Sequence, residues 1–330
     1  MTLRLSTYKT IWPLAAPFRI TGKVFEETET LTVEVSDGDH IGRGESVGVF
    51  YLGDNAPRMI EIIESVRGEI EAGISIDAVQ ELLPPCGARN ALDCALWDLE
   101  TKRSKKSIWA LTGIVPKSIQ TVYTIGIEAT AAEMATNAER AKAYPFLKIK
   151  LDSEEPVAKI EAIRAARPDA VLVIDANQGF DFSQLKGVLP EFERLGVSML
   201  EQPLPRGADQ VLEVFHSPIP LCADESCLNL AELPSALSKY DMINIKLDKC
   251  GGLTEALKMA RQAREAGKQV MVGNMMGTSL SMSPSYVLAQ LCDIVDLDGP
   301  LGLKSDYLDG FGYDGPNMVP PGKLWGRLRE

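Results

Sequence analysis

The sequence has only two histidines, His40 and His216, among its 330 residues. So few histidines nearly exclude a multi-histidine metal centre and argue against a Ser-His-Asp hydrolase. Cysteine is also scarce, and none of the six forms a CxxC pair; they stand at positions 86, 94, 222, 227, 250 and 292. This spacing is typical of reduced core thiols in a cytoplasmic protein, and not of a disulfide framework or a zinc site.

Long apolar runs and an excess of positive charge are missing as well. The longest apolar runs have about five residues, as at 170–174, which is too few to span a bilayer. Pro13 and Pro17 interrupt the first apolar stretch, which therefore does not resemble a signal peptide. With 34 Lys and Arg against 46 Asp and Glu, the net charge is −12, which argues against a nucleic-acid or anionic-membrane surface. We therefore expect a cytoplasmic protein with no nucleic-acid or membrane partner.

The composition supports a large packed core, because 45% of the residues are hydrophobic and 24% are charged. The first part of the chain mixes strand and helix patterns. Residues 31–35 alternate as a half-buried strand, and helical patterns follow at 56–71, 75–83 and 88–103. This part is predicted to be an α+β region.

From residue 120 onward, short apolar segments alternate with amphipathic helical patterns. Eight strands are predicted, at 120–125, 146–150, 171–175, 197–201, 220–223, 242–247, 269–273 and 293–297. Helical patterns lie between them, at 130–143, 154–166, 183–195, 229–238, 253–266 and 278–290. Eight such units, spaced by roughly 22 to 27 residues, favour a (β/α)8 barrel over the alternative of a doubly wound open sheet. The repeat continues past six strands and no GxGxxG follows the first strand, which also favours the barrel.

The predicted fold class is therefore α/β, with a (β/α)8-type barrel (a modified TIM barrel) and an N-terminal α+β capping domain. We place the capping domain at 1–117 and the barrel catalytic domain at 118–310. The Gly- and Pro-rich residues 311–330 carry no repeat. We expect this C-terminal segment to return to the capping domain and complete it.

Charged residues close the predicted strands at corresponding places. Asp175, Glu201 and Asp224 end three consecutive strands, so they meet at the face where barrels of this kind build active sites. Three carboxylates this close do not all ionise without a cation, and ligands that offer only oxygen suit Mg²⁺. The alternative is that each is a separate helix N-cap or loop ion pair.

Lysines flank these carboxylates on both sides. Lys148 and Lys150 share the inward face of the second strand, and Lys246 ends the sixth strand, which lies opposite in an eight-stranded ring. A lysine beside other cations has a lowered pKa and can act as a general base, while a protonated partner returns a proton from the other side. The alternative is that the lysines merely pair with the carboxylates. Lys249 is predicted to fall on the other face of the strand, or just past it.

The chemistry that fits this arrangement is removal of a proton next to a carboxylate. Mg²⁺ would bind the substrate carboxylate and stabilise an enediolate while one lysine takes the α-proton. Two opposed lysines allow removal on one face and return on the other. The predicted reaction is therefore racemisation or epimerisation.

The chain resembles the enolase superfamily, its muconate-cycloisomerase-like subgroup, and most closely the L-Ala-D/L-Glu epimerase group of dipeptide epimerases. The segments that carry the resemblance are ARNALDCALWDLETKR (88–103), KIKLD (148–152), DANQG (175–179), EQPLP (201–205), CADES (222–226), NIKLDKCGGLTEAL (244–257) and DLDGP (296–300). The resemblance implies that Asp175, Glu201 and Asp224 are Mg²⁺ ligands and that Lys150 and Lys246 are the acid/base pair. It also implies that Lys148 and Thr124 contact a small dipeptide substrate.

Two aspartates and one loop bear on which substrate is used. The resemblance implies that Asp296 and Asp298 bind the free α-ammonium of a dipeptide; the alternative is an ordinary turn before Gly299-Pro300. Relatives that act on Ala-Glu often place an arginine in the loop that here spans 18–29. Arg19 and Lys23 are available there, whereas Phe25, which aligns nearer to that arginine, would suit an apolar side chain. The same loop is predicted to be either a mobile lid over the substrate or an ordinary surface loop.

The leading hypothesis is thus a Mg²⁺-dependent dipeptide epimerase that inverts the α-carbon of the C-terminal residue. With Ala-Glu as substrate, it would serve peptidoglycan recycling. The alternatives on the same scaffold are an N-acylamino-acid racemase, a muconate cycloisomerase and an o-succinylbenzoate synthase. A different class is a barrel that binds metal without catalysis. We expect a homo-oligomer, because barrels of this kind often assemble.

Overall fold

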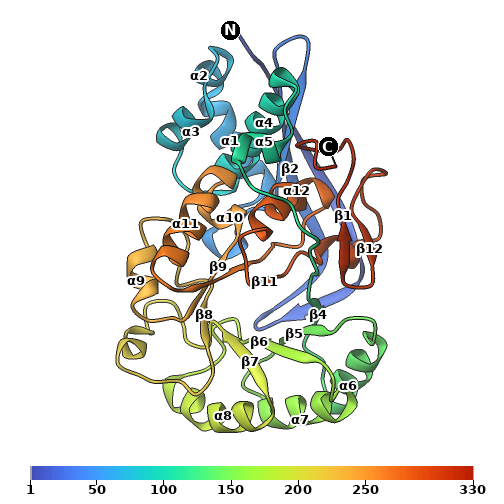
Figure 1. Ribbon diagram of the computed structural model, residues 1–330, viewed down its shortest axis with the longest axis vertical. Coiled ribbons are helices and arrows are strands. Elements are labelled where there is room, and N and C mark those ends of the chain that lie inside the picture. Colours follow the sequence, from blue (N-terminus) through green and yellow to red (C-terminus); the bar gives the residue numbers. More distant parts are fainter. Residues whose placement is uncertain (1, 330) are drawn as a thin grey trace.

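The chain folds into an eight-stranded parallel sheet and a separate three-stranded antiparallel sheet (Figure 1). The computed structural model describes residues 2–329. In the parallel sheet, neighbouring strands are neighbours in sequence, and they are β4 (Tyr123–Ile125), β5 (Phe146–Lys150), β6 (Val171–Asp175), β7 (Val197–Glu201), β8 (Leu221–Ala223), β9 (Met242–Ile245), β10 (Gln269–Val272) and β11 (Ile294–Val295). All eight predicted strands are therefore confirmed, several of them slightly shorter than expected.

The two edges of this sheet meet and make it a barrel. The backbone N–H of Val122, just before β4, donates to the carbonyl of Val295 in β11 at 2.9 Å. Beside it, the N–H of Leu297 donates to the Thr121 hydroxyl at 2.9 Å. The predicted (β/α)8-type barrel is confirmed.

Helices follow the strands, and the longer ones cover the outside of the barrel (Figure 1). They are α6 (Ala131–Arg140), α7 (Pro156–Ala166), α8 (Phe182–Arg194), η2 (Gln210–Glu213), α9 (Leu233–Leu237), α10 (Leu247–Cys250), α11 (Leu253–Glu265), α12 (Ser279–Ala289) and η3 (Gly299–Gly302). The helix expected over 229–238 begins only at Leu233. Asn229 explains the late start, because its side chain accepts the backbone N–H of Ala231 and holds a turn there.

Strand residues alternate between the helix layer and the inside of the barrel. Leu172 and Ile174 of β6 belong to the large core between strands and helices. Val173, between them, belongs to a small inner cluster that also contains Val122, Met199, Cys222, Met242 and Met271. Asp175 is two residues beyond Val173, so it shares the inward face.

The antiparallel sheet, five α-helices and one 3-10 helix form a second unit, here called the cap. Its elements are β1 (Arg4–Ile20), β2 (Lys23–Ser36), β3 (Ile41–Ser46), η1 (Phe50–Leu52), α1 (Ala56–Ser65), α2 (Arg67–Glu71), α3 (Ile76–Leu82), α4 (Gly87–Ser104) and α5 (Ile108–Thr112). α4 lies directly against β3, because a Cβ atom at Gly42 or Gly44 would come within 2.1 Å of a carbonyl oxygen of α4. The single helix expected over 56–71 is two helices, since Val66 leaves the helical conformation between them.

The segment 18–29 is not the loop that the sequence predicts. β1 and β2 pair almost along their whole length, with Ile20 opposite Lys23, so the turn consists of Thr21 and Gly22 alone. The register shifts between Pro13 and Phe18. The polar residues of this segment lie along a twisted β-ribbon that reaches from the cap down to the barrel (Figure 1).

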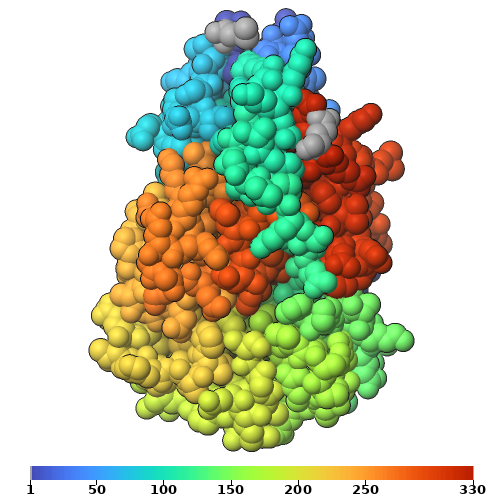
Figure 2. Space-filling view, in the orientation of Figure 1, coloured from blue at the N-terminus to red at the C-terminus, as the bar shows by residue number. Residues whose placement is uncertain are grey.

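The C-terminal residues return to the cap after a short hairpin of β12 (Gly312–Asp314) and β13 (Asn317–Val319). The buried Trp325 indole donates to the carbonyl of Cys94 in α4 at 2.9 Å, and the next N–H, of Gly326, donates to Asp98 at 3.0 Å. Figure 2 shows this part of the chain (red) packed beside the helices around residue 100 (teal). Throughout the described chain, each helix is too short or too polar to span a lipid bilayer.

Candidate active site

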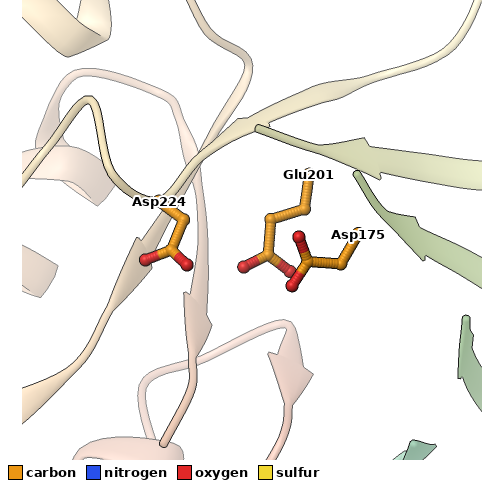
Figure 3. Close-up of side chains that lie close together, drawn as sticks. All are labelled: Asp175, Glu201 and Asp224. Carbon is orange, nitrogen blue, oxygen red and sulfur yellow. The ribbon is translucent and has the colours of Figure 1, made fainter. Parts of the chain in front are cut away.

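Three carboxylates converge at the carboxyl ends of consecutive barrel strands. Asp175 and Glu201 are the last residues of β6 and β7 and lie side by side in register, and Asp224 directly follows β8. All three are buried, and one oxygen from each lies within 4.8 Å of the others. Figure 3 shows their carboxylates pointing toward one another. The predicted convergence is confirmed, and these residues are called the carboxylate triad below.

The triad members titrate differently because their neighbours differ. Burial raises the pKa of Asp175, but the ammonium groups of Lys150 and Lys148 outweigh it and hold the pKa at about 2. Burial and the charge of Asp175 raise the pKa of Glu201 to about 7. The triad thus contains a carboxyl group whose ionisation is opposed by its neighbours.

A divalent cation fits this donor set. Glu201 Oε1 accepts a 2.6 Å hydrogen bond from the Asn244 amide. Its other oxygen, Oε2, lies 2.8 Å from Lys148 Nζ but has no hydrogen-bond partner within residues 2–329. Three buried carboxylates whose oxygens lie within 4.8 Å of one another suit a cation that prefers oxygen ligands.

Lys150 and Lys246 lie on opposite flanks of the triad. Lys150 Nζ is 2.6 Å from Asp175 Oδ2, and Lys246 Nζ is 2.6 Å from Asp224 Oδ2. β5, which carries Lys150, and β9, which leads into Lys246, are four strands apart in an eight-stranded order. The sequence left two alternatives open, lysines on opposite sides of the site or lysines paired with the carboxylates. In the structure, Lys150 and Lys246 do both.

The pKa of Lys246 is raised when no cation lies among the carboxylates, whereas the lowered pKa expected from the sequence depends on such a cation. Burial lowers its pKa, but the carboxylates of Asp224 and Glu201 outweigh burial and raise it above the ordinary value. The expectation rested on positive charge among the carboxylates. A cation bound by the triad would oppose the raised pKa, because it repels the ammonium form.

Lys148 occupies the centre of the site. Its Nζ lies 2.7 Å from Asp296 Oδ2, 2.8 Å from Glu201 Oε2 and 3.2 Å from Asp175 Oδ2. Burial lowers the pKa of Lys148, yet these three carboxylates raise it well above the ordinary value. Lys148 is thus a fixed positive charge at the floor of the site.

Asp296 and Asp298 come together at the mouth of the barrel, but their surroundings differ. Asp296 pairs with Lys148 and also lies near the Asn274 amide. Asp298 accepts the backbone N–H of Thr124 at 2.6 Å. Burial and the neighbouring Asp296 raise the pKa of Asp298 to about 7. Asp298 would therefore gain from a cationic group placed beside it.

A cavity of about 970 Å³ opens above these groups and reaches the cap. The tip of the β1–β2 hairpin forms part of its wall, and the tip is anchored to the barrel because the Thr21 hydroxyl donates to carbonyls of Leu151 and Ala176. Lys23 Nζ lies 4.6 Å from the ring centre of Phe25 and 3.9 Å from that of Phe50. The predicted specificity residues Arg19, Lys23 and Phe25 all line this cavity.

The sequence did not predict three buried groups next to the site. Lys249 donates to Asp224, Asn244 donates to Glu201, and Glu225 lines the cavity with its Oε2 unbonded among the described residues. Lys249 was expected on the other face of a strand. The chain instead turns into α10 at Lys246, and a helical spacing of three returns Lys249 to the site.

Residues 3–113 match the family described as "Mandelate racemase / muconate lactonizing enzyme, N-terminal domain". Residues 130–296 match "Enolase C-terminal domain-like". The chain belongs to the enolase superfamily. Its barrel and its cap are thus features of a superfamily fold, and the protein is an enzyme of the isomerase class.

Two relatives cover almost the whole chain. The L-Ala-D/L-Glu epimerase of Escherichia coli (strain K12) is 39% identical over 305 residues, which are 92% of this chain and 95% of that protein. The N-acetyl-D-glutamate racemase of a Pseudoalteromonas species is 40% identical over 299 residues, with 90% and 95% covered.

Solved structures show the same architecture. An enolase family member from Agrobacterium tumefaciens with homology to dipeptide epimerases, bound to sodium and L-Ala-L-Glu, superimposes with a TM-score of 0.95. It is 37% identical, and 98% of this chain and 100% of that chain are covered. A dipeptide epimerase from Methylococcus capsulatus, complexed with Mg and L-Arg-D-Lys, has a TM-score of 0.90 and 28% identity, with 98% and 99% covered.

Proposed function

We propose that this enzyme is a Mg²⁺-dependent dipeptide epimerase that inverts the α-carbon of the C-terminal residue of its substrate. The observation that carries the proposal is the placement of Lys150 and Lys246 on opposite flanks of the triad. Two ammonium-bearing side chains that face each other across one site can serve both faces of a carbon atom. The similarity to named dipeptide epimerases supports the same reaction.

Asp175, Glu201 and Asp224 would hold Mg²⁺. The ion would supply positive charge that stabilises negative charge on the substrate carboxylate when the α-proton leaves. Lys148, held between Asp296 and Glu201, adds a second fixed positive charge for the same carboxylate. The three buried carboxylates, one oxygen from each within 4.8 Å of the others, support the metal assignment.

The proton balance involves the two lysines alone. One lysine, as a neutral amine, takes the proton from the α-carbon and becomes an ammonium. The other, as an ammonium, gives its proton to the opposite face and becomes a neutral amine. Exchange with water restores both. A proton delivered to the opposite face inverts the α-carbon, and either lysine can begin the reaction, so both directions are available.

The substrate amine is assigned to Asp298. This carboxyl group accepts the backbone N–H of Thr124, and burial together with the neighbouring Asp296 raises its pKa to about 7. An α-ammonium would offset that unfavourable burial of negative charge. Thr124 fixes Asp298 and thereby contributes to the amine site.

The C-terminal side chain is assigned to the cavity wall under the hairpin. Arg19 and Lys23 line this wall. Lys23 lies over the rings of Phe25 and Phe50, and no carboxylate pairs with either cation within residues 2–329. Two cations without carboxylate partners favour an acidic side chain, so we propose L-Ala-D/L-Glu or a related acidic dipeptide. With that substrate the enzyme would take part in cytoplasmic reuse of cell-wall peptides.

A second candidate is racemisation of an N-acylated amino acid. It is favoured by 40% identity to an N-acetyl-D-glutamate racemase, whose substrate shares the glutamate side chain but has no free ammonium. Arg19 and Lys23 in the cavity wall would suit the glutamate side chain of either substrate, whereas Asp298 favours the dipeptide.

We also propose the domain limits 1–117, 118–310 and 311–330, which the matched segments 3–113 and 130–296 support.

The test is incubation in D₂O with Mg²⁺ and a panel of L-Ala-L-Glu, L-Ala-L-Leu and N-acetyl-L-glutamate. Deuterium at the α-carbon is measured by mass spectrometry, and inversion by chiral chromatography. The proposal expects exchange with inversion of L-Ala-L-Glu and loss of both when Mg²⁺ is chelated. Exchange limited to N-acetyl-glutamate would establish the second candidate instead. No exchange with any substrate by the folded, Mg²⁺-supplied protein would contradict both.

A further inference from the structure

The single turn α10 carries a buried lysine that the proposed proton transfers do not use. Lys249 is 2% exposed. Its Nζ donates to Asp224 Oδ1 at 2.6 Å, to the Asp224 carbonyl at 2.6 Å and to the Asn244 carbonyl at 2.9 Å. An ammonium group has three N–H donors, so all of them are engaged. Lys249 is also not part of the cavity wall, and it therefore does not exchange a proton with a substrate there.

Asp224 is held by a different lysine at each oxygen. Lys249 binds Oδ1, and Lys246 binds Oδ2 at 2.6 Å. Lys249 binds the main-chain carbonyl of the same residue as well, so one ammonium fixes backbone and side chain together. Rotation of the Asp224 carboxylate would break a charge-assisted hydrogen bond in a buried place.

The contacts of Lys249 extend to a second triad member through Asn244. The carbonyl of Asn244 accepts from Lys249, while its side-chain amide donates to Glu201 Oε1 at 2.6 Å. Asn244 has no exposed surface. Lys249 and Asn244 together therefore determine the orientation of Asp224 and Glu201 from behind the site.

We propose that Lys249 is a positioning residue that orients Asp224 for metal binding. The inference rests on the proposed function, because it takes Asp224 to be a Mg²⁺ ligand. A positioning role and a purely electrostatic role for Lys249 predict opposite changes in Mg²⁺ affinity when the lysine is removed. If Lys249 acted through charge alone, its removal would leave the triad more negative and would tighten Mg²⁺ binding. If it acts by orientation, its removal weakens binding.

The experiment is titration calorimetry of Mg²⁺ binding without substrate, on wild type, Lys249→Met and a matched control. The control is Lys159→Met. Lys159 is also buried, in α7, and its Nζ donates to Asp152 at 3.0 Å. Neither residue lines the cavity. We expect Lys249→Met to raise the Mg²⁺ Kd by about 10- to 100-fold, the usual effect of losing a residue that orients a metal ligand. Lys159→Met should leave the Kd unchanged. An unchanged or lower Kd for Lys249→Met overturns the inference.

A second variant at position 249 and a check of folding separate loss of orientation from loss of the fold. Lys249→Gln retains N–H donors without the charge and should give an intermediate Kd, and circular dichroism shows whether each variant is folded. If neither variant folds, a crystal structure of the Mg²⁺-loaded wild type decides: Lys249 Nζ should remain within hydrogen-bonding distance of Asp224 Oδ1, and separation of the two overturns the inference. Failure of the wild type to bind Mg²⁺ would instead contradict the proposed function.

Discussion

The Ser46 hydroxyl donates a 2.6 Å hydrogen bond to Asp248 Oδ1, although the two residues are 202 positions apart. The same oxygen accepts the backbone N–H groups of Val47 and Gly48, each at 3.0 Å. Ser46 ends the cap strand β3, and Asp248 lies two residues after Lys246. The cap segment that brings Phe50 and Tyr51 to the cavity is thus fixed to the turn that carries a proposed acid/base lysine.

Replacing Asp248 by alanine should weaken substrate binding more than turnover. The change leaves three donors without their acceptor and frees the cap segment after Ser46, at a cost of roughly 2–4 kcal/mol in unfolding free energy. We expect KM to rise about tenfold with a smaller fall in kcat, measured with L-Ala-L-Glu. Asp248→Asn keeps an acceptor oxygen and should restore most of the affinity. Equal loss in both variants would contradict this explanation.

Removal of Lys150 and removal of Lys246 should each stop proton transfer on one face of the α-carbon, and on opposite faces. Lys150→Ala and Lys246→Ala should each lower epimerisation by at least about 10²- to 10⁴-fold, because each removes the proton carrier for one face. In D₂O, each variant should retain α-deuterium exchange with only one of L-Ala-L-Glu and L-Ala-D-Glu, and the two variants should retain opposite ones. Retention of the same epimer by both would show that the lysines do not serve opposite faces.

Asp298→Asn should separate the two candidate substrates. The variant loses the negative charge beside the proposed amine site, so KM for L-Ala-L-Glu should rise about 10- to 100-fold, as expected for loss of a charged hydrogen-bonding partner worth roughly 1.5–3 kcal/mol. The rate with N-acetyl-L-glutamate should change little, because that substrate has no ammonium. A parallel loss with both substrates would assign Asp298 a structural role.

Lys23→Met should reduce the preference for an acidic dipeptide. Lys23 lies over Phe25 and Phe50 at the cavity wall, and methionine keeps the length of the side chain without its charge. We expect kcat/KM to fall about fivefold for L-Ala-L-Glu and to hold or rise for L-Ala-L-Leu, since one partly exposed ion pair is worth roughly 1 kcal/mol. Lys186→Met is the matched control, because Lys186 lies 5.0 Å from the ring centre of Phe182 outside the cavity. The control should leave both rates unchanged.

Because of Glu45, the free energy of unfolding should fall as the pH rises from about 5 to 7. Burial raises the pKa of this cap carboxyl group to about 7, although Thr278 donates to it at 2.6 Å. The folded form thus holds its proton at a pH where the unfolded chain, with a pKa near 4.5, has lost it. The stabilisation is complete below the unfolded pKa and is lost as the pH passes the folded one.

Glu45→Gln removes this titration. Relative to wild type, the variant should gain stability between pH 5 and pH 8, on the order of 2–3 kcal/mol, since each unit of pKa shift corresponds to about 1.4 kcal/mol. Urea unfolding at several pH values measures the gain. A constant difference between variant and wild type over this range would refute the assignment to Glu45.

Local periodicity was enough to predict the barrel and its strand-end residues. Asp175, Glu201 and Asp224 each follow an apolar strand at a regular interval, and parallel strands place such positions at one face. The cap was harder, because β1 and β2 lack strict alternation and their pairing extends through a segment rich in polar residues. The loop expected at 18–29 followed from the resemblance to relatives and from Gly22 among polar residues, and neither contains this strand pairing.

The positions of Lys249, Ser46 and Asp248 could not be predicted from the local sequence, because they depend on tertiary contacts. Lys249 reaches Asp224 only because the chain turns into α10 at Lys246, and period-two alternation, extended by three residues, predicts the opposite face. Ser46 and Asp248 meet through tertiary packing across most of the sequence. The sequence also predicts which charged groups are neighbours without predicting which charge lies nearest to Lys246, and here the carboxylates of Asp224 and Glu201 raise its pKa.

The return of Trp325 to α4 sets an order for biosynthesis. The indole binds Cys94, and Gly326 binds Asp98, so α4 lacks these partners while the ribosome is still making the barrel. The first 113 residues emerge early, but their helix layer is completed only after residue 326 has been translated. Early release of a polypeptide that lacks this last stretch would therefore leave the Cys94 carbonyl and the buried Asp98 carboxylate of α4 without these donors.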